Sequence, residues 1–140
     1  MDKPVITENR ITIPPSLEFL SEVDSFIEGI LRSYDTDEST VADIAISVSE
    51  LVNNAVTHGQ KAASDKAIVI EIKSVKDKVI ITVSDHGGGF DPDQLDDPLA
   101  DENLLKEVGR GLFIVKSLMD DVDINVSAQG TAITITKTIK

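Results

Sequence analysis

Three short segments, which follow one another in a fixed order, constrain the fold and chemistry of this chain more than any other feature. The first, from Glu50 to Gly59, places a carboxylate and a carboxamide four residues apart on a predicted helix. The second begins with Asp85 at the end of a predicted strand and continues into glycines. The third, from Gly109 to Leu112, opens a predicted helix. In this order they predict a nucleotide site without a phosphate-binding lysine loop.

The size and composition of the chain predict a single domain over residues 1–140. Hydrophobic residues make up 41% of the sequence, and their runs are too short to cross a membrane. The N-terminus lacks the basic and apolar regions of a signal peptide, so we expect a cytoplasmic protein without membrane association. The absence of cysteine excludes disulfides and cysteine-based catalysis or metal binding.

The charge of the chain argues against nucleic acid as a direct partner. The sequence has 25 acidic and 13 basic residues, a formal net charge of −12. Binding to nucleic acid requires clustered lysines and arginines that displace counterions from phosphates, and no such cluster is present. The acidity indicates either protein partners with basic or mixed surfaces, or a role in solubility alone.

The first part of the chain predicts a strand followed by two helices. Residues 10–13 alternate in polarity and stop at two prolines, and Ser16 is a suitable cap for a helix over residues 16–34. A polar break over residues 35–39 leads into a second helix that ends near Gly59.

The second helix carries two opposite stripes. Its apolar stripe repeats at 100° per residue and consists of Val41, Ile44, Ala45, Val48, Val52 and Ala55. Its polar stripe consists of Asp43, Ser47, Glu50, Asn54 and His58. In an isolated amphipathic helix such a polar stripe is usually a face in solvent. The alternative is that it carries the functional groups of a site.

The rest of the chain predicts two hairpins with a long loop and a helix between them. Four alternating segments form the strands of these hairpins: residues 67–73, 78–84, 121–127 and 130–139. The loop covers residues 87–108 and the helix residues 111–119. This order of elements predicts an α+β two-layer sandwich, with a mixed, mostly antiparallel sheet covered by helices on one face.

The three segments resemble the sequence boxes of an ATPase superfamily that includes gyrase, the heat-shock chaperone ATPase domain, sensor histidine kinases and mismatch-repair ATPases. The likeness is closest to the small bacterial anti-sigma-factor serine/threonine-protein kinases, and it runs from about Ile11 to the C-terminus. The matching segments begin at Glu50, Asp85 and Gly109, and the pair Gly130-Thr131 resembles the family's terminal glycine and threonine. The resemblance implies a Bergerat-type fold that binds ATP with Mg²⁺.

At the second box, the resemblance implies that Asp85 accepts a hydrogen bond from the adenine amino group, with support from Thr131. A buried acceptor of this kind discriminates by roughly 10⁴-fold against a base that lacks the donor. Gly87 and Gly89 leave room where the backbone approaches the base and adopts positive φ. Taken alone, Asp85, Gly87 and Gly89 are more typical of a turn after a strand, and Thr131 is compatible with an ordinary strand threonine.

At the first box, Asn54 offers an amide oxygen that suits the Mg²⁺ accompanying ATP. Glu50 lies one turn earlier on the same helix face. Its carboxylate can accept the proton of the attacking hydroxyl, a contribution of roughly 10²–10⁴ in rate. Asn53 points about 100° away on the helix, so we expect it to be structural.

At the third box, Gly109 and Gly111 are expected to begin a helix, whose free backbone amides and dipole form an anion site for the phosphates. Arg110 would add a cation there, and Leu112 completes the box. The alternative is a helix-capping glycine pair with a surface arginine. The acidic segment over residues 91–107 corresponds to the lid that covers ATP in this superfamily, and we assign no role to its residues.

The resemblance implies an anti-sigma factor and kinase that phosphorylates a serine of an anti-sigma-factor antagonist, with a sigma factor as second partner and a homodimer as the assembly. One alternative is a non-catalytic, nucleotide-gated binding module, or a switch kinase that acts on a phosphatase regulator. Another is a detached histidine-kinase ATP domain. That reading is disfavoured because His58 and His86 both lie within nucleotide boxes and no dimerisation hairpin is expected before Ile11. The presence of Glu50 favours catalysis over binding alone.

Overall fold

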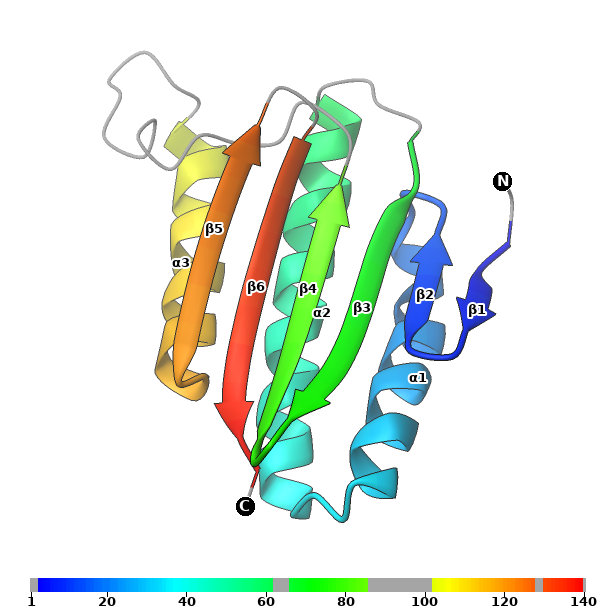
Figure 1. Ribbon diagram of the computed structural model, residues 1–140. Helices are drawn as coiled ribbons and strands as arrows, with labels where there is room; N and C mark the ends of the chain where they lie inside the picture. Colours follow the sequence, from blue (N-terminus) through cyan, green and yellow to red (C-terminus); the bar gives the residue numbers. More distant parts are fainter. Residues whose placement is uncertain (1–2, 62–65, 86–101, 128–129, 140) are drawn as a thin grey trace.

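The computed structural model describes residues 3–61, 66–85, 102–127 and 130–139. Six strands form one sheet in the order β1-β2-β3-β4-β6-β5, and every neighbouring pair is antiparallel. The helices α1, α2 and α3 lie side by side on one face of this sheet (Figure 1). The predicted α+β two-layer sandwich is therefore confirmed.

The elements agree with the prediction except at two places. Their bounds are β1 (Val5–Thr7), β2 (Arg10–Ile13), the 3₁₀ turn η1 (Leu17–Phe19), α1 (Leu20–Ser33), α2 (Glu38–Lys61), β3 (Ile68–Val75), β4 (Lys78–Asp85), α3 (Glu102–Leu118), β5 (Asp121–Ser127) and β6 (Gly130–Thr138). The edge strand β1 was not predicted, and α3 begins well before residue 111. No helix within the described ranges has the length and apolar character that a membrane span requires.

The core forms where the apolar faces of the helices meet the covered face of the sheet. Residues of β3 and β4 alternate between buried and less buried, as expected for a sheet with one covered face. The largest fully buried side chains include Ile11, Ile13, Ile27, Leu31, Ile44, Leu51, Ile68, Ile70, Ile72, Ile81 and Ile135. This core fixes which face of α2 turns toward the sheet.

The pairing of β4 with β6 determines what stands at the end of the sheet. Val83 pairs with Ile133, and Asp85 pairs with Thr131 two residues further along. Because side chains alternate along a strand, all four belong to the face that the helices cover. The register therefore places a carboxylate beside a hydroxyl at the carboxyl end of β4, next to α2.

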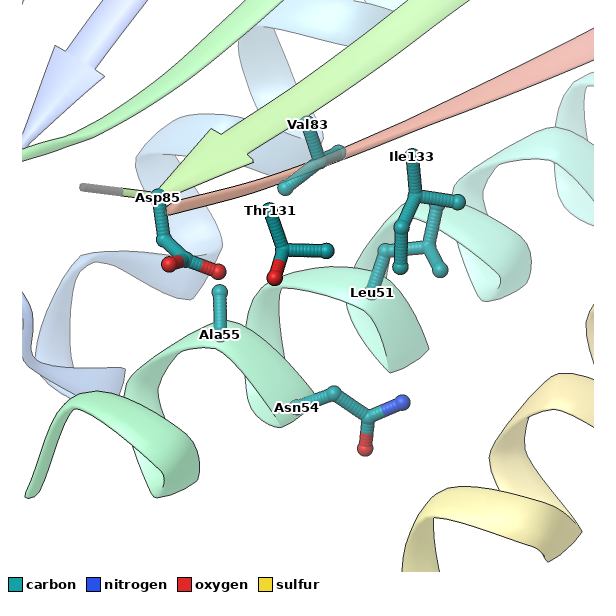
Figure 2. A pocket seen from close by; sticks show the side chains of 7 residues that line it. All are labelled: Leu51, Asn54, Ala55, Val83, Asp85, Thr131 and Ile133. Atoms are coloured by element: carbon teal, nitrogen blue, oxygen red, sulfur yellow. The ribbon is translucent and has the colours of Figure 1, made fainter. Parts of the chain in front are cut away.

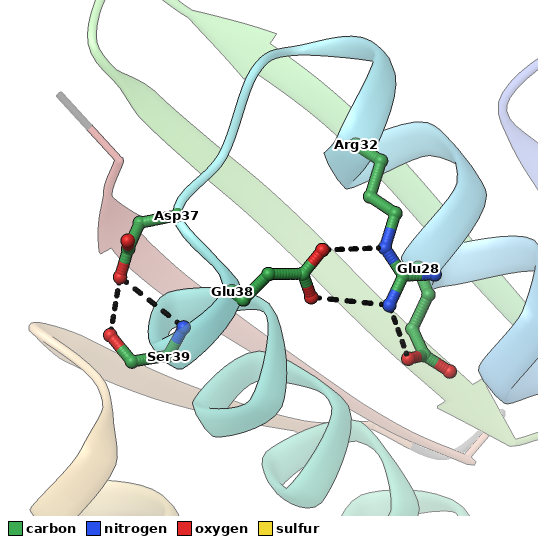
Figure 3. A network of polar contacts seen from close by, with 5 residues as sticks. All are labelled: Glu28, Arg32, Asp37, Glu38 and Ser39. Carbon is green, nitrogen blue, oxygen red and sulfur yellow. Dashed lines mark hydrogen bonds and ion pairs between the residues drawn. The ribbon is translucent and has the colours of Figure 1, made fainter.

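Polar contacts fix the connection between α1 and α2 (Figure 3). The Arg32 guanidinium donates from Nε to Glu38 Oε1 at 3.0 Å and from Nη2 to Glu28 Oε1 at 3.3 Å. The Asp37 carboxylate accepts from the Ser39 hydroxyl and from the Ser39 backbone N–H, the latter at 3.2 Å, so it caps the start of α2. These contacts hold the pKa of both Asp37 and Glu38 below its usual range. They set the starting point of the helix that carries the first box.

A second polar contact joins the middles of the same two helices. The Ser49 hydroxyl of α2 donates to Asp24 Oδ1 of α1 at 3.0 Å. Partial burial raises the pKa of the Asp24 carboxyl, and the hydrogen bond from Ser49 opposes that rise. The α1–α2 contact therefore combines a polar link with the buried Val23, Ile27 and Leu31 of α1.

Candidate functional site

The residues predicted to bind adenine meet at a small cavity between α2 and the ends of β4 and β6. The cavity is lined by Leu51, Asn54, Ala55, Val83, Asp85, Thr131 and Ile133 (Figure 2). In this view the side chains of Asp85 and Thr131 point from the sheet toward α2, and the Asn54 amide points toward α3. The structure thus brings three predicted site residues, from three different elements, to one place.

The cavity is much smaller than a nucleotide base. Its volume is about 10 Å³, which is about the room that a single water requires. Pockets that hold drug-sized ligands enclose roughly 300–1,000 Å³. As described, the cavity is therefore too small to enclose an adenine ring.

The polar face of α2 is covered by α3. A Cβ atom placed on Gly111 would lie 3.0 Å from Glu50 Oε2 and 3.2 Å from Asn54 Nδ2. A side chain at this position would press on both groups, so glycine favours the close approach between the two helices. Asn54 is buried, and its Nδ2 has no hydrogen-bond partner among the described residues. The structure therefore brings Glu50, Asn54 and Gly111 into one contact.

The common reading of the polar stripe of α2, as a face in solvent, is wrong for this chain. Ser47 is fully buried, and its hydroxyl donates to the Asp43 carbonyl at 2.9 Å. Asn54 is buried as well. The apolar stripe is buried as predicted except for Ala45, which is half-buried. The difference arises because α3 packs on a side of α2 that an isolated amphipathic helix would leave open.

The expected helix start at the third box is also wrong. The helix α3 begins at Glu102, so Gly109 and Gly111 lie in its interior, and residues 102–107 of the expected lid belong to its first turns. Backbone amides inside a helix bond to carbonyls one turn earlier and are not free for an anion. Residues 102–107 are mostly good helix formers, which offset the roughly 1 kcal/mol that each glycine costs a helix.

Arg110 and Leu112, the other members of the third box, lie on opposite sides of α3. The Arg110 side chain is exposed, whereas Leu112 is buried in the core. The C-terminal end of the helix is tied to β6, because Lys137 Nζ donates to the Leu118 carbonyl at 2.7 Å. The neighbouring Asp120 carboxylate accepts from the Thr138 N–H at 2.6 Å, which holds the pKa of Asp120 below its usual range. One end of α3 is therefore anchored.

Several predicted residues lie outside the part of the chain that the structure describes. These are Gly87 and Gly89 of the second box, His86, and residues 91–101 of the expected lid. The side chain of His58, in the last turns of α2, also lies outside the described set.

Four apolar residues of the cavity were not predicted to line the site. They are Leu51, Ala55, Val83 and Ile133. Simple spacing would have found three of them, because Ala55 follows Leu51 by one helical turn and Val83 precedes Asp85 on the same face of its strand. Ile133 then follows from the strand pairing, which the sequence does not fix by itself.

Comparison with known sequences agrees with this geometry. The family model described as "Histidine kinase-like ATPase domain" matches residues 13–137. The chain is 34% identical over 138 residues to the serine-protein kinase RsbW of Staphylococcus aureus strain MRSA252, and the match covers 94% of this chain and 86% of the relative. The protein of strain Newman matches to the same extent. The predicted kinship with anti-sigma-factor serine kinases is thereby confirmed.

Comparison with solved structures supports the fold. The RsbU and RsbW domains of Rv1364c from Mycobacterium tuberculosis give a TM-score of 0.68 at 24% identity, covering 94% of this chain and 33% of that one. The SiaB–SiaC complex from Pseudomonas aeruginosa gives a TM-score of 0.61 at 12% identity, covering 98% and 90%. Because the family model matches residues 13–137 and RsbW is a 34% identical relative, the chain belongs to the histidine kinase-like ATPase family.

Proposed function

We propose that this chain is an ATP-dependent protein serine/threonine kinase and anti-sigma factor, which phosphorylates a serine of an anti-sigma-factor antagonist. One observation carries the proposal: Asn54, Asp85 and Thr131 converge on one cavity, and Glu50 and Asn54 face the same glycine of α3. The naming of a 34% identical relative as a serine-protein kinase supports the reaction. The alternatives are a nucleotide-gated binding module without catalysis and a switch kinase acting on a phosphatase regulator.

The roles follow from position. Asp85 at the end of β4 accepts a hydrogen bond from the adenine amino group, and Thr131 stands opposite it on β6. Arg110 and the backbone around Gly109 and Gly111 contact the phosphates once the turns of α3 before Gly109 have unwound and freed these amides. Gly87, Gly89 and Leu112 complete the nucleotide site by their correspondence to the family boxes.

The residues around Asn54 fit a magnesium ion brought in by ATP. The described residues contain no group of three or more histidine, cysteine, aspartate or glutamate side chains suited to a metal. Mg²⁺ commonly needs only one or two protein ligands and takes the rest from phosphates and water. The Asn54 amide, buried next to Gly111 and the Glu50 carboxylate, can be such a ligand. When bound, the ion would neutralise phosphate charge, which an acidic protein would otherwise repel.

Glu50 is the proposed general base. It accepts the proton of the substrate serine while the serine oxygen bonds to the γ-phosphorus and the bond from phosphorus to the ADP oxygen breaks. In the present structure Glu50 faces α3 across Gly111. Nucleotide binding must therefore open this contact before transfer, which links the nucleotide state to the shape of the protein.

The partners and assembly belong to the same proposal. The antagonist is the phosphoryl acceptor, a sigma factor is the second protein partner, and the working assembly is a homodimer in the cytoplasm. Direct contact with nucleic acid is not part of the function, in keeping with the net charge of −12.

The decisive experiment measures transfer of radiolabelled phosphate from ATP to the antagonist. Glu50→Gln should keep nucleotide affinity while turnover falls by at least about 100-fold, because only the proton acceptor is lost. Absence of transfer by the wild-type protein, together with nucleotide-dependent binding of a sigma factor, would replace the kinase by the binding module.

A neighbouring pair of asparagines tests the metal site. Asn54→Ala should abolish Mg²⁺-dependent nucleotide binding measured by calorimetry, whereas Asn53→Ala should leave it largely intact. Asn53 is the matched control, since it has the same chemistry one position earlier and does not line the cavity. Equal losses in both variants would show that the ion is not held at Asn54.

A further inference from the structure

The outward face of α3 carries an apolar surface that the proposed chemistry does not use. Phe113 is 72% exposed and Ile114 is 38% exposed, although Leu112 and Val115 beside them are buried in the core. With Gly109 and Arg110, these two residues line a shallow hollow of about 440 Å³. We call these four residues the Phe113 surface.

The exposure of Phe113 is unusual within this chain. The sequence has only four phenylalanines and one tyrosine. Among the described residues, the other aromatic side chains, Phe19, Phe26 and Tyr34, are partly buried and pack against the core. Phe113 is thus the described aromatic residue that turns to solvent, on a helix whose other face contributes to the core.

The charge around this surface differs from that of the chain as a whole. Residues 109–119 contain two basic residues, Arg110 and Lys116, and no acidic one, in a chain with 25 acidic and 13 basic residues. Both basic side chains are exposed. The nearest carboxylates along the chain are Glu107, whose side chain lies outside the described set, and Asp120, which is engaged by the Thr138 N–H. Among the described side chains, the Phe113 surface is therefore apolar with a basic border.

The chemistry of the surface indicates a protein as its occupant. Aromatic residues and arginine are enriched where protein interfaces are strongest. Two basic side chains are too few to bind nucleic acid, which requires clustered lysines and arginines. An anionic membrane would repel a chain of this net charge. The matching partner presents an apolar side chain bordered by carboxylates.

We infer that the Phe113 surface docks the protein substrate, through a segment of the substrate in which carboxylates surround an apolar residue. The inference rests on the proposed function, because it assigns a site to the same substrate. Gly111, two residues from Phe113 on the opposite side of α3, faces Glu50 and Asn54. A substrate held on the outer side of α3 is therefore one helix diameter from the phosphoryl-transfer site. Nucleotide binding that shifts α3 also moves the docking surface, so affinity for nucleotide and for substrate are coupled.

The test compares three variants in phosphorylation of the purified antagonist. Phe113→Gln, which keeps a good helix former at an exposed position, should raise the KM for the antagonist about tenfold. The conservative Phe113→Tyr should restore most of the wild-type value. The matched control is Val75→Ser, at a valine that is 48% exposed at the end of β3, and its KM should be unchanged.

Charge and nucleotide binding provide the second readout. Lys116→Glu should raise the KM a few-fold and weaken the salt dependence of antagonist binding, because one attraction is lost. The affinity of Phe113→Gln for ATP, measured by calorimetry without antagonist, should stay within about twofold of the wild type, and its circular dichroism melting curve should be unchanged.

Three outcomes would overturn the inference. One is an unchanged antagonist KM in Phe113→Gln while transfer itself is normal, which leaves the kinase proposal standing. Another is a loss of ATP affinity in Phe113→Gln that is as large as its rise in antagonist KM. That result would mean that the nucleotide or the chain's own acidic segment covers Phe113. If the wild type transfers no phosphate, calorimetry tests the docking site separately from the kinase proposal. It compares the affinity of the same antagonist for ADP-loaded wild type and for ADP-loaded Phe113→Gln. Equal affinities, or no binding by either, would then overturn the docking site.

Discussion

The two sides of α2 are held by contacts of different kinds. On the α1 side, Val23, Ile27 and Leu31 are buried, and Ser49 bonds to Asp24 at 3.0 Å. On the α3 side, the approach is made at Gly111 against a carboxylate and an amide, whose Nδ2 finds no partner among the described residues. Separating α1 from α2 exposes apolar surface. Opening α3 at Gly111 returns polar groups to water, although Leu112 and Val115 of the same helix are buried in the core. We therefore expect the contact at Gly111 to open more readily than the α1–α2 contact.

The anchoring of α3 supports this difference. Its C-terminal end is joined to β6 through Lys137 and the Leu118 carbonyl. Asp120, just after the end of α3, is held to β6 as well, because its backbone N–H donates to the Thr136 carbonyl at 2.9 Å. Motion of α3 is therefore expected at its N-terminal half, around Gly109 and Gly111, while its last turn stays with the sheet.

The largest expected effect comes from the same substitution made on each side. Val23→Ala in α1 and Val115→Ala in α3 both remove methyl groups from fully buried positions. Val23→Ala should lower the free energy of unfolding by about 2 kcal/mol, because the surrounding helices cannot close the cavity. Val115→Ala should cost less in global unfolding and instead accelerate hydrogen exchange in α3. Urea denaturation and exchange rates measure the two effects. Equal global losses with no local change in exchange would show that α1 and α3 form one cooperative unit.

A smaller effect is expected from alanine at the two glycines of α3. A Cβ on Gly109 has nothing within 4 Å, so Gly109→Ala should stabilise the protein by roughly 0.5–1 kcal/mol through helix propensity. A Cβ on Gly111 would press on Glu50 and the buried Asn54, so Gly111→Ala should lose that gain and destabilise relative to Gly109→Ala. Thermal unfolding compares them directly. If both variants gain stability alike, the helices are not in close contact at Gly111.

The smallest effect concerns the polar link on the α1 side. Burial raises the folded-state pKa of Asp24 above 3.8, so ionising this carboxyl opposes folding. The protonated carboxyl makes its full contribution to the free energy of unfolding below the unfolded-state pKa. This contribution is lost as the pH rises through the folded-state pKa. Asp24→Asn should therefore raise the melting temperature slightly at pH 7 and leave it unchanged well below pH 3.8. The exposed turn variant Asp77→Asn is the control. A gain for Asp24→Asn that is independent of pH would contradict this account.

The sequence predicted the layers of the fold because most elements follow simple periodicities. The alternation in the segments that became β3, β4, β5 and β6 and the apolar stripe of α2 needed no tertiary information. The edge strand β1 escaped notice because its three residues are all exposed and show no alternation. The predicted start of α3 is wrong because glycines indicate a helix boundary, whereas here the preceding residues continue the helix.

The candidate site was predicted in its residues and less well in its environment. Local patterns place Asn54 on a helix and Asp85 at a strand end, but only the register of β6 brings Thr131 opposite Asp85. The burial of Ser47 and Asn54 depends on α3, which comes from a distant part of the chain. Helical periodicity cannot distinguish a polar face in solvent from one covered by another helix.

The pairing of Asp85 with Thr131 also limits how chains of this kind tolerate insertions and deletions. Both residues stand on the last rung shared by β4 and β6. A deletion within β6 that shifts the pairing by one residue would turn Thr131 to the opposite face of the sheet and bring Gly130 or Ala132 beside Asp85. Extra residues in the connection between β5 and β6 leave that rung intact. Length variation is therefore expected to collect in that connection, whereas the number of residues from Thr131 to the end of β6 should stay fixed.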